Sequence, residues 1–201
     1  MNLGVALLVV YLQPLGRALP DADVQAVKDA LVGLYGAEVR VLERRDLPKR
    51  AWYPPRKRWR AEKLLDFLDE LAPNDADQVL GLTADDISTT KGDVEDWGVM
   101  GLGEDPGRAA VISTFRCRKK TRARDPDEHA RERLAKTAAH EIGHTLGLDH
   151  CPTRGCLMED AEGSVLTTDR EYDLCQKCRA KLAKQGRALP SPPSLPWPRV
   201  L

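Results

Sequence analysis

The sequence predicts a protein of the α/β (α+β) class, in which helices pack on a mixed, twisted β-sheet. Between residues 5 and 115, short runs rich in β-forming residues alternate with segments that repeat apolar residues at helical spacing. A long and sharply bounded helix is predicted between residues 125 and 146. With 201 residues, of which 42% are hydrophobic, the chain can bury one core. These observations favour one domain built as an α/β sandwich.

Five strands and two helices are predicted before residue 116. The first helix, 21–35, carries Val24, Val27, Leu31 and Leu34 on one face, and Gly36 follows as its stop signal. A second amphipathic helix is predicted at 61–71, after an extended loop marked by Pro48, Pro54 and Pro55. The strands are predicted at 5–12, 38–42, 78–82, 98–103 and 109–115.

The third helix has the clearest start signals in the chain. Asp125 can cap it, Pro126 suits its first turn, and Glu128 stands where a capping-box acid belongs. One side of this helix is apolar up to residue 146, and His140 and His144 lie on the opposite side. We therefore expect one face in the core and the other in a cleft. The predicted core face consists of Leu134, Ala135, Ala138, Ala139, Ile142 and Leu146.

Residues 140–150 read H-E-x-x-H-x-x-G-x-x-H, which is the spacing of a catalytic zinc site. His140 and His144 are one helical turn apart, and Gly147 can turn the chain so that His150 becomes a third ligand. Three protein ligands leave one tetrahedral position for water, which is typical of catalytic zinc. Glu141 can reach that water as a general base. A surface histidine helix is the plain alternative, but three of the four histidines fall on this motif.

Four cysteines follow in two pairs and predict a second metal site. Cys151 and Cys156 come directly after the motif, and Cys175 and Cys178 form a C-x2-C pair. Four thiolates can close a tetrahedral structural zinc site, although an even set also permits two disulfides. The fifth cysteine, Cys117, stands between two arginines. It is either a reactive thiol of lowered pKa or a small residue at a strand end, and we expect the latter.

The order H-C-x4-C-x-M-x16-C-x2-C after the last motif histidine resembles the archaemetzincin family of metzincin zinc metallopeptidases. The resemblance implies a zinc metalloprotease that hydrolyses peptide bonds of peptide or protein substrates, with two Zn²⁺ ions per chain. It implies Met158 as the Met-turn residue beneath the catalytic metal, and an antiparallel edge strand that pairs with the substrate. The 98–103 strand is our candidate for that edge. The implied residues are His140, His144 and His150 for catalytic zinc, Glu141 as base, and Cys151, Cys156, Cys175 and Cys178 for structural zinc.

We expect the metalloprotease domain to span residues 1–186, with an N-terminal subdomain of about 1–147 and a small zinc-stapled C-terminal subdomain of about 148–186. A last helix at 168–184 would carry the C-x2-C pair. Residues 187–201 contain five prolines, and they are predicted to be a disordered tail without regular structure. A docking segment around Trp197 is the alternative.

Charge and hydropathy limit the partners. Lys plus Arg equals Asp plus Glu at 31 each, so no net field predicts nucleic acid or a membrane surface. The basic runs 49–60 and 116–124, the first interleaved with aromatic residues, are interpreted as solvated loops balanced by the acidic stretch 75–96. The apolar run 3–12 is too short to span a bilayer, and we expect a buried strand rather than a signal segment.

These observations predict a cytoplasmic monomer, where thiols stay reduced, with no nucleic acid or membrane partner. Two alternatives to an active enzyme remain. One is a catalytically silent zinc-binding protein whose cleft is closed. The other is an interaction module that uses the four-cysteine zinc and the basic runs. His129, outside the motif, is expected to be a surface residue.

Overall fold

The central layer is a five-stranded sheet with the strand order β2-β1-β5-β9-β8. The computed structural model describes residues 7–121 and 124–198, so the first two residues of the predicted 5–12 strand lie outside the described part. The parallel strands are β1 (Val9–Leu15), β2 (Glu38–Val41), β5 (Gln78–Thr83) and β9 (Ala109–Ser113). The edge strand β8 (Gly101–Gly103) runs antiparallel to β9. The predicted mixed sheet is therefore confirmed.

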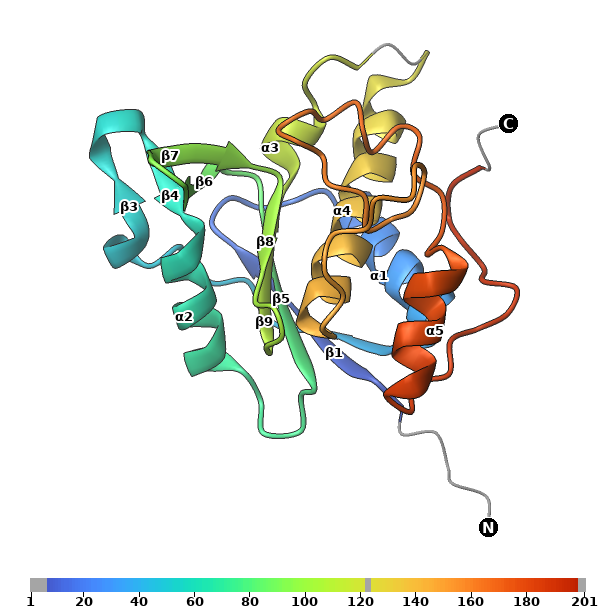
Figure 1. Cartoon of the computed structure of the whole chain (residues 1–201). Helices are drawn as coiled ribbons and strands as arrows, with labels where there is room; N and C mark the ends of the chain where they lie inside the picture. The colour runs from blue at the N-terminus through green and yellow to red at the C-terminus, as the bar shows by residue number, and fades with distance from the viewer. Residues whose placement is uncertain (1–6, 122–123, 199–201) are drawn as a thin grey trace.

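Helices cover both faces of this sheet (Figure 1). The helix α2 (Ala61–Leu71) lies on one face, and α1 (Asp21–Tyr35) and α4 (Pro126–Thr145) lie on the other. Side chains alternate between the faces along each strand, so Val10 and Leu12 join the α1 and α4 side while Tyr11 and Leu15 join the α2 side. The sheet thus separates two hydrophobic cores.

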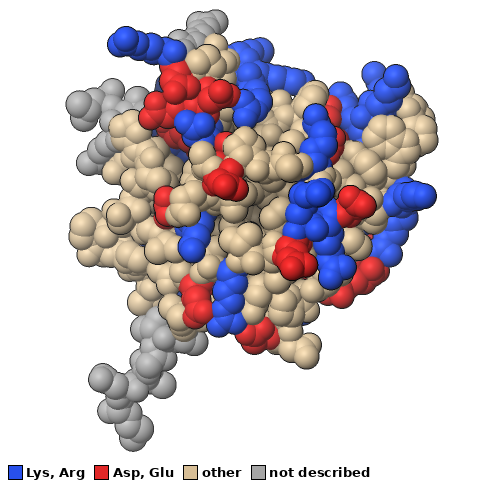
Figure 2. Space-filling model, turned by 180° about the vertical axis from the view of Figure 1, so that it is seen from behind, with Lys and Arg blue, Asp and Glu red and all other residues tan. Residues whose placement is uncertain are grey.

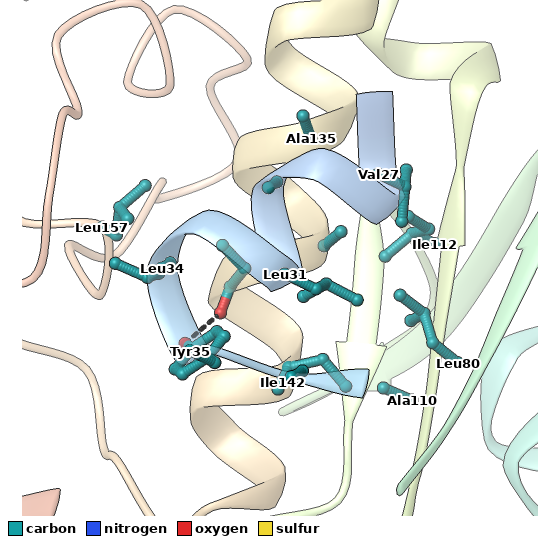
Figure 3. Packing of buried hydrophobic residues seen from close by; sticks show 14 of the residues in the cluster. Val27, Leu31, Leu34, Tyr35, Leu80, Ala110, Ile112, Ala135, Ile142 and Leu157 are labelled. Carbon is teal, nitrogen blue, oxygen red and sulfur yellow. Dashed lines mark hydrogen bonds between the residues drawn. The ribbon is translucent and has the colours of Figure 1, made fainter. Parts of the chain in front are cut away.

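The core between the sheet, α1 and α4 fixes the position of α4 (Figure 3). The predicted apolar face of α4 is buried throughout, with no residue more than 6% exposed. A leucine such as Leu31, which is fully buried on α1, contributes about 1.5–3 kcal/mol by its removal from water. In addition, the Tyr35 hydroxyl donates a hydrogen bond to the Ala139 carbonyl at 2.6 Å. This packing holds one face of α4 and leaves the other free.

The ends of α1 and α4 follow the predicted signals. Gly36 adopts a left-handed conformation (φ 65°) directly after α1. The Asp125 side chain accepts hydrogen bonds from the backbone N–H groups of Asp127 and Glu128, which caps α4. The helix ends at Thr145, one residue before the predicted end. The strand predicted to continue to residue 115 instead gives way to a short helix, α3 (Thr114–Cys117).

A second, four-stranded sheet was not predicted. Its order is β3-β4-β6-β7, formed by β3 (Trp52–Tyr53), β4 (Arg58–Arg60), β6 (Ile87–Lys91) and β7 (Val94–Val99). Two 3-10 turns, Lys49–Ala51 and Pro54–Arg56, occupy the predicted proline loop. The single strand predicted at 98–103 is wrong, because the chain leaves β7 at Val99 and enters β8 of the other sheet at Gly101. The polar sequence of β6 and β7 gave no clear strand pattern.

The basic run 49–60 is paired with acids, as the interpretation of a balanced loop predicts. Arg58 contacts Asp86 at 2.8 Å and Asp96 at 2.7 Å, and Arg50 contacts Glu70 at 2.7 Å. Figure 2 shows Lys and Arg side chains on the rear face with Asp and Glu between them. Among the described residues, no helix has the length and apolar character needed to cross a membrane.

The last helix, α5 (Gln176–Lys184), begins eight residues later than predicted, with Cys175 as its N-cap residue. The following segment has no helix or strand, as expected, but it is packed rather than disordered as far as Pro198. Trp197 is 4% exposed, and its indole N–H donates to the Tyr172 carbonyl at 2.8 Å. Burial of this large side chain, with Leu189 and Leu195 against the core, accounts for the difference from the predicted disorder. Residues 199–201 lie outside the described part.

Candidate active site

The helix α4 presents two imidazoles one turn apart. The Nε2 atoms of His140 and His144 lie 3.0 Å from each other, and the two rings meet edge to face. Both side chains project from the side of α4 that the core does not use, which is the arrangement predicted from the spacing. His129, on an earlier turn, is not part of this group. It is half-buried rather than on the surface, and its ring contacts Asp169 at 2.8 Å.

A turn after α4 brings the third histidine back. Gly147 has φ 81°, a conformation that side chains rarely adopt. The Leu148 N–H donates to the Gly143 carbonyl at 2.9 Å and closes the turn. The His150 ring then lies 5.4 Å from the His140 ring and 4.8 Å from the His144 ring, measured between centroids. One nitrogen from each of the three rings falls within a group whose atoms are all within 4.8 Å of one another.

Each imidazole also faces an oxygen through its Nδ1 atom. His140 Nδ1 donates to the Leu157 carbonyl at 2.6 Å, His144 Nδ1 lies 3.8 Å from Asp105, and His150 Nδ1 lies 3.5 Å from Asp160. The hydrogen bond to the Leu157 carbonyl holds the His140 ring in the tautomer that leaves Nε2 free for a metal, whereas the Asp105 carboxylate is too far from His144 Nδ1 for a hydrogen bond. Burial, together with the neighbouring His144, lowers the pKa of His140 to about 3, so this ring is neutral. The donor set, three imidazoles, fits zinc.

Glu141 lies between α4 and the edge strand β8. A Cβ atom added to Gly101 would come within 2.5 Å of Glu141 Oε1, and one added to Gly103 within 2.6 Å of the Glu141 carbonyl oxygen. Only glycine therefore allows β8 to approach the helix this closely. Burial raises the pKa of Glu141 to about 8, and a backbone hydrogen bond from Gly103 opposes that rise. The predicted base thus lies beside the predicted edge strand.

A cleft of about 820 Å³ opens over this arrangement. The three histidines and Glu141 line it together with β8, the β6–β7 hairpin and the loop that follows Met158. The motif side chains therefore line an open cleft, although Glu141 itself is only 7% exposed, whereas the silent-protein alternative assumed a closed cleft.

The four predicted cysteines come together in one cluster. Three pairs of sulfur atoms are 3.7, 3.8 and 3.7 Å apart: Cys151 with Cys175, Cys156 with Cys178, and Cys175 with Cys178. Four sulfurs about 2.3 Å from a central zinc would be about 3.8 Å from each other at tetrahedral angles. All five cysteines are free thiols, which differs from the two-disulfide alternative. The cluster can therefore hold a tetrahedral zinc ion.

Cys117 lies apart from this cluster and is fully buried. Burial raises the pKa of its thiol to about 12, so the alternative of a reactive thiol with lowered pKa is wrong. The flanking arginines do not face the sulfur. Arg116 contacts Asp86 at 2.9 Å, and Arg118 pairs with Asp127.

Met158 is fully buried beneath α4. A Cβ atom added to Gly143 would overlap with the Met158 sulfur, so the thioether lies directly under the helix between the two motif histidines. The Cys151 N–H donates to the Met158 carbonyl at 2.7 Å, which ties this residue to the start of the cysteine cluster. The Met-turn role that the resemblance implied for Met158, beneath the catalytic metal, stays a prediction.

Sequence reasoning did not find the three oxygens that face the imidazoles. Asp105 and Asp160 come from separate loops, and the Leu157 oxygen belongs to the backbone. No spacing rule connects such positions with the motif. The one sequence signal that pointed to these oxygens was that Leu157 and Asp160 lie on either side of Met158, the residue expected beneath the catalytic metal.

Comparisons with known proteins agree with this geometry. The profile of peptidase family M54 matches residues 21–184. An archaemetzincin from Methanopyrus kandleri is 37% identical over 156 residues, which cover 76% of this chain and 82% of the relative. The crystal structure of archaemetzincin from that organism has a TM-score of 0.75 at 31% identity and covers 92% of this chain and 98% of its own.

A second solved structure leads to the same assignment. The archaemetzincin from Archaeoglobus fulgidus has a TM-score of 0.71 at 33% identity, with 87% of this chain and 99% of that chain covered. The matched region contains all three motif histidines and all four clustered cysteines. The chain therefore belongs to peptidase family M54, with archaemetzincins as its relatives, and it is a zinc metallopeptidase.

Proposed function

We propose that the chain hydrolyses peptide bonds in the cleft above α4, with His140, His144 and His150 holding a catalytic zinc ion and Glu141 acting as general base. One observation carries the proposal. Three imidazole nitrogens converge at the surface of an open cleft, with a buried carboxylate and a free sheet edge beside them. This combination supports metal-assisted hydrolysis of an extended peptide.

In a three-histidine site, zinc would lower the pKa of a coordinated water to about 7 and act as a Lewis acid toward the substrate carbonyl. The chain's own residues do the remaining work. The positive charge of a zinc ion at the three histidines would favour the ionised form of Glu141, and its carboxylate takes the proton of the attacking water and passes it to the leaving amine. The free edge of β8 pairs with the substrate backbone and orients the scissile bond. The Leu157 carbonyl, which accepts the hydrogen bond of His140 Nδ1, holds that ring in place.

We further propose that Cys151, Cys156, Cys175 and Cys178 hold a second, structural zinc ion. The spacing of the sulfur atoms supports it, and four thiolates leave no open position for a substrate. In this proposal the segment after Gly147 is a small subdomain, stapled by the metal, that forms one wall of the cleft. The monomeric state and the cytoplasmic location stay predictions.

The proposal is tested with Glu141→Gln. The zinc-loaded protein is incubated with a peptide library, and the products are identified by mass spectrometry. We expect Glu141→Gln to lose about 10²-fold to 10⁴-fold in rate, because the base is removed while shape is kept. Zinc content and melting temperature should stay those of the parent. Glu128→Gln, at the exposed start of α4, is the matched control and should cleave normally.

Two results would contradict parts of the proposal. Undiminished hydrolysis by Glu141→Gln would remove the general-base role. Absence of hydrolysis by the zinc-loaded parent protein, over the whole library, would remove the proposed peptidase activity of this cleft.

A further inference from the structure

The charges along the cleft are divided between its two ends. Asp105 and Asp149 line the end where α4 finishes. Lys119 and Lys120, which follow α3, line the opposite end. Their place is fixed by the Lys119 carbonyl, which accepts a hydrogen bond at 2.7 Å from Arg133, in the first half of α4. The catalytic residues lie between an acidic end and a basic end.

Three lysines line the cleft: Lys119 and Lys120 at the basic end, and Lys91, whose ammonium lies 5.5 Å from the centroid of the Trp97 ring. Asp149 is paired with Lys181 at 2.6 Å, and the nearby Arg116 is paired with Asp86 at 2.9 Å. Lys119 and Lys120 are exposed, and within residues 7–121 and 124–198 neither forms an ion pair. The Lys119 ammonium lies 4.9 Å from the centroid of the Phe115 ring, an exposed aromatic contact that leaves its charge unneutralised by any acid in the described part of the chain.

An acid does lie near the basic end, but it does not neutralise it. Glu171 also lines the cleft and is only 2% exposed. Burial raises its pKa to about 8, so the carboxyl is mostly neutral at pH 7. The other nearby acids are engaged elsewhere, since Glu159 pairs with Arg170 and Asp160 lies 3.5 Å from His150.

The direction of a bound peptide follows from β8. A Cβ atom at Gly101 would meet the Glu141 side chain, and one at Gly103 would lie 3.3 Å from His144 Cβ, so β8 and α4 run in the same direction. A substrate that pairs antiparallel with the free edge of β8 therefore runs the opposite way. Its amino end points toward Asp105, and its carboxyl end points toward the two lysines.

The distance between the catalytic histidines and the two lysines can be measured along α4. Arg133, which marks the level of Lys119, lies seven residues before His140, a separation of about 10 Å at 1.5 Å per residue. An extended peptide covers this separation with about three residues. A carboxylate two or three residues after the scissile bond would therefore lie at the two lysines.

We propose that Lys119 and Lys120 bind a substrate carboxylate that lies two or three residues after the scissile bond, on its C-terminal side. This inference rests on the proposed peptidase function and adds a substrate class to it. The carboxylate is either the free chain terminus or an Asp or Glu side chain at that place.

The test uses one peptide sequence that the parent enzyme cleaves three residues before its end. It is made as the free acid, as the C-terminal amide, and as the amide with Asp in the last position. Dissociation constants are measured calorimetrically on the zinc-loaded Glu141→Gln protein, so that binding is separated from turnover. The same measurements are made after adding Lys119→Ala and Lys120→Ala together, with Lys63→Ala, an exposed lysine on α2, as the matched control.

We expect the free acid to bind roughly threefold to tenfold more tightly than the amide, as two exposed charge contacts allow. The advantage should shrink with added salt, disappear in the double lysine variant and persist in Lys63→Ala. Recovery of tight binding by the Asp amide would assign the site to any carboxylate, and no recovery would assign it to the chain terminus. Equal binding of acid and amide by the Glu141→Gln protein that keeps both lysines, or continued discrimination after Lys119→Ala and Lys120→Ala are added, overturns the proposal. Turnover of the same three peptides by the parent enzyme separates the lysine proposal from the peptidase proposal. Equal cleavage of the free acid, the amide and the Asp amide overturns only the carboxylate site at the lysines. Absence of cleavage of all three peptides overturns the peptidase function.

Discussion

The four histidines of this chain differ in what surrounds them, and that difference predicts their roles. His140, His144 and His150 each keep one ring nitrogen in a shared group that faces the cleft. His129 uses its Nε2 atom to contact Asp169, beside Arg133. Metal binding is therefore expected from three histidines and structural support from the fourth.

His144→Ala should lower the zinc content from two ions per chain to one. Removal of one of three ligands leaves a site too weak to keep the metal through dialysis, while the four thiolates are untouched. The content is measured by atomic emission with thiols kept reduced. His129→Ala is the control, and it should keep both ions. A parent protein with a single zinc, or a variant that still holds two, would contradict the two-site proposal.

At the scale of residues, the motif predicted which side chains come together, since its spacing on one helix and one turn is a local property. The environments of these side chains were not predictable. Asp105 faces His144 only because β8 and α4 are packed against each other. The arginines beside Cys117 suggested a lowered pKa of its thiol. Their guanidinium groups instead form ion pairs with carboxylates, and the sulfur is buried in the core, which raises the pKa of the thiol.

At the scale of elements, prediction succeeded where the signals are local. The bounds of α1 and α2 are those predicted, because apolar periodicity and flanking residues mark both ends. The second sheet was missed because pairing between β4 and β6 joins residues far apart in the sequence. The start of α5 was predicted too early, since residues 168–174 instead support α4 through contacts such as the Thr168 carbonyl with Lys136.

The contact between α4 and Met158 makes a prediction about Gly143. Alanine normally stabilises a helix interior by about 1 kcal/mol relative to glycine. Here the added methyl would overlap with the fully buried Met158 sulfur and come within 3.2 Å of the Tyr35 hydroxyl. We expect Gly143→Ala to destabilise the protein by about 1–3 kcal/mol, as overpacking does. Urea denaturation of the zinc-loaded protein measures the change.

A double-mutant cycle with Met158→Ala identifies the cause. If the clash is responsible, Gly143→Ala should cost less, or become stabilising, once the Met158 side chain is truncated. An unchanged cost in the Met158→Ala background would show that the methyl group is opposed by something other than the thioether. A stabilised single variant would show that Met158 is free to move away.

For the whole molecule, the buried carboxyl of Glu171 predicts how stability depends on pH. Burial raises its pKa from 4.5 to about 8, with Lys136 opposing the rise. Between these values the folded protein binds more protons than the unfolded chain, so this group's contribution to stability is lost as pH rises through that window. The loss is on the order of a few kcal/mol. Glu171→Gln should remove it.

The measurement compares the free energy of unfolding at pH 5.5 and pH 8 for zinc-loaded parent and variant. Metal binding also depends on pH, but that dependence is common to both proteins and cancels in the difference. The parent should lose more stability than Glu171→Gln over this interval. Parallel pH profiles would mean that Glu171 does not titrate in this window.

The cysteine cluster joins the start of α5 to the loop after α4, beside the catalytic residues. Cys175 and Cys178 belong to the start of α5, and Cys156 precedes Leu157, whose carbonyl accepts the hydrogen bond of His140. The Leu157 N–H in turn donates to the Asp173 carbonyl at 3.0 Å. We therefore expect a change at the sulfurs to alter the orientation of His140 through the two hydrogen bonds of the Leu157 backbone.

Cys178→Ser should remove the structural zinc ion, and it should lower the melting temperature by roughly 10 °C or more, because metal binding supplies folding free energy to a segment with a small core of its own. It should also weaken binding of the catalytic zinc, although Cys178 touches none of the histidines, since the support of His140 by Leu157 is loosened.

Cys117→Ala, at a buried cysteine outside the cluster, is the control and should keep both ions even if it melts earlier. Calorimetry and competition with a zinc chelator give the two readouts. Parent-like melting with two bound ions would reject the four-thiolate site, whereas loss of one ion with unchanged affinity at the histidines would reject only the coupling between the two metals.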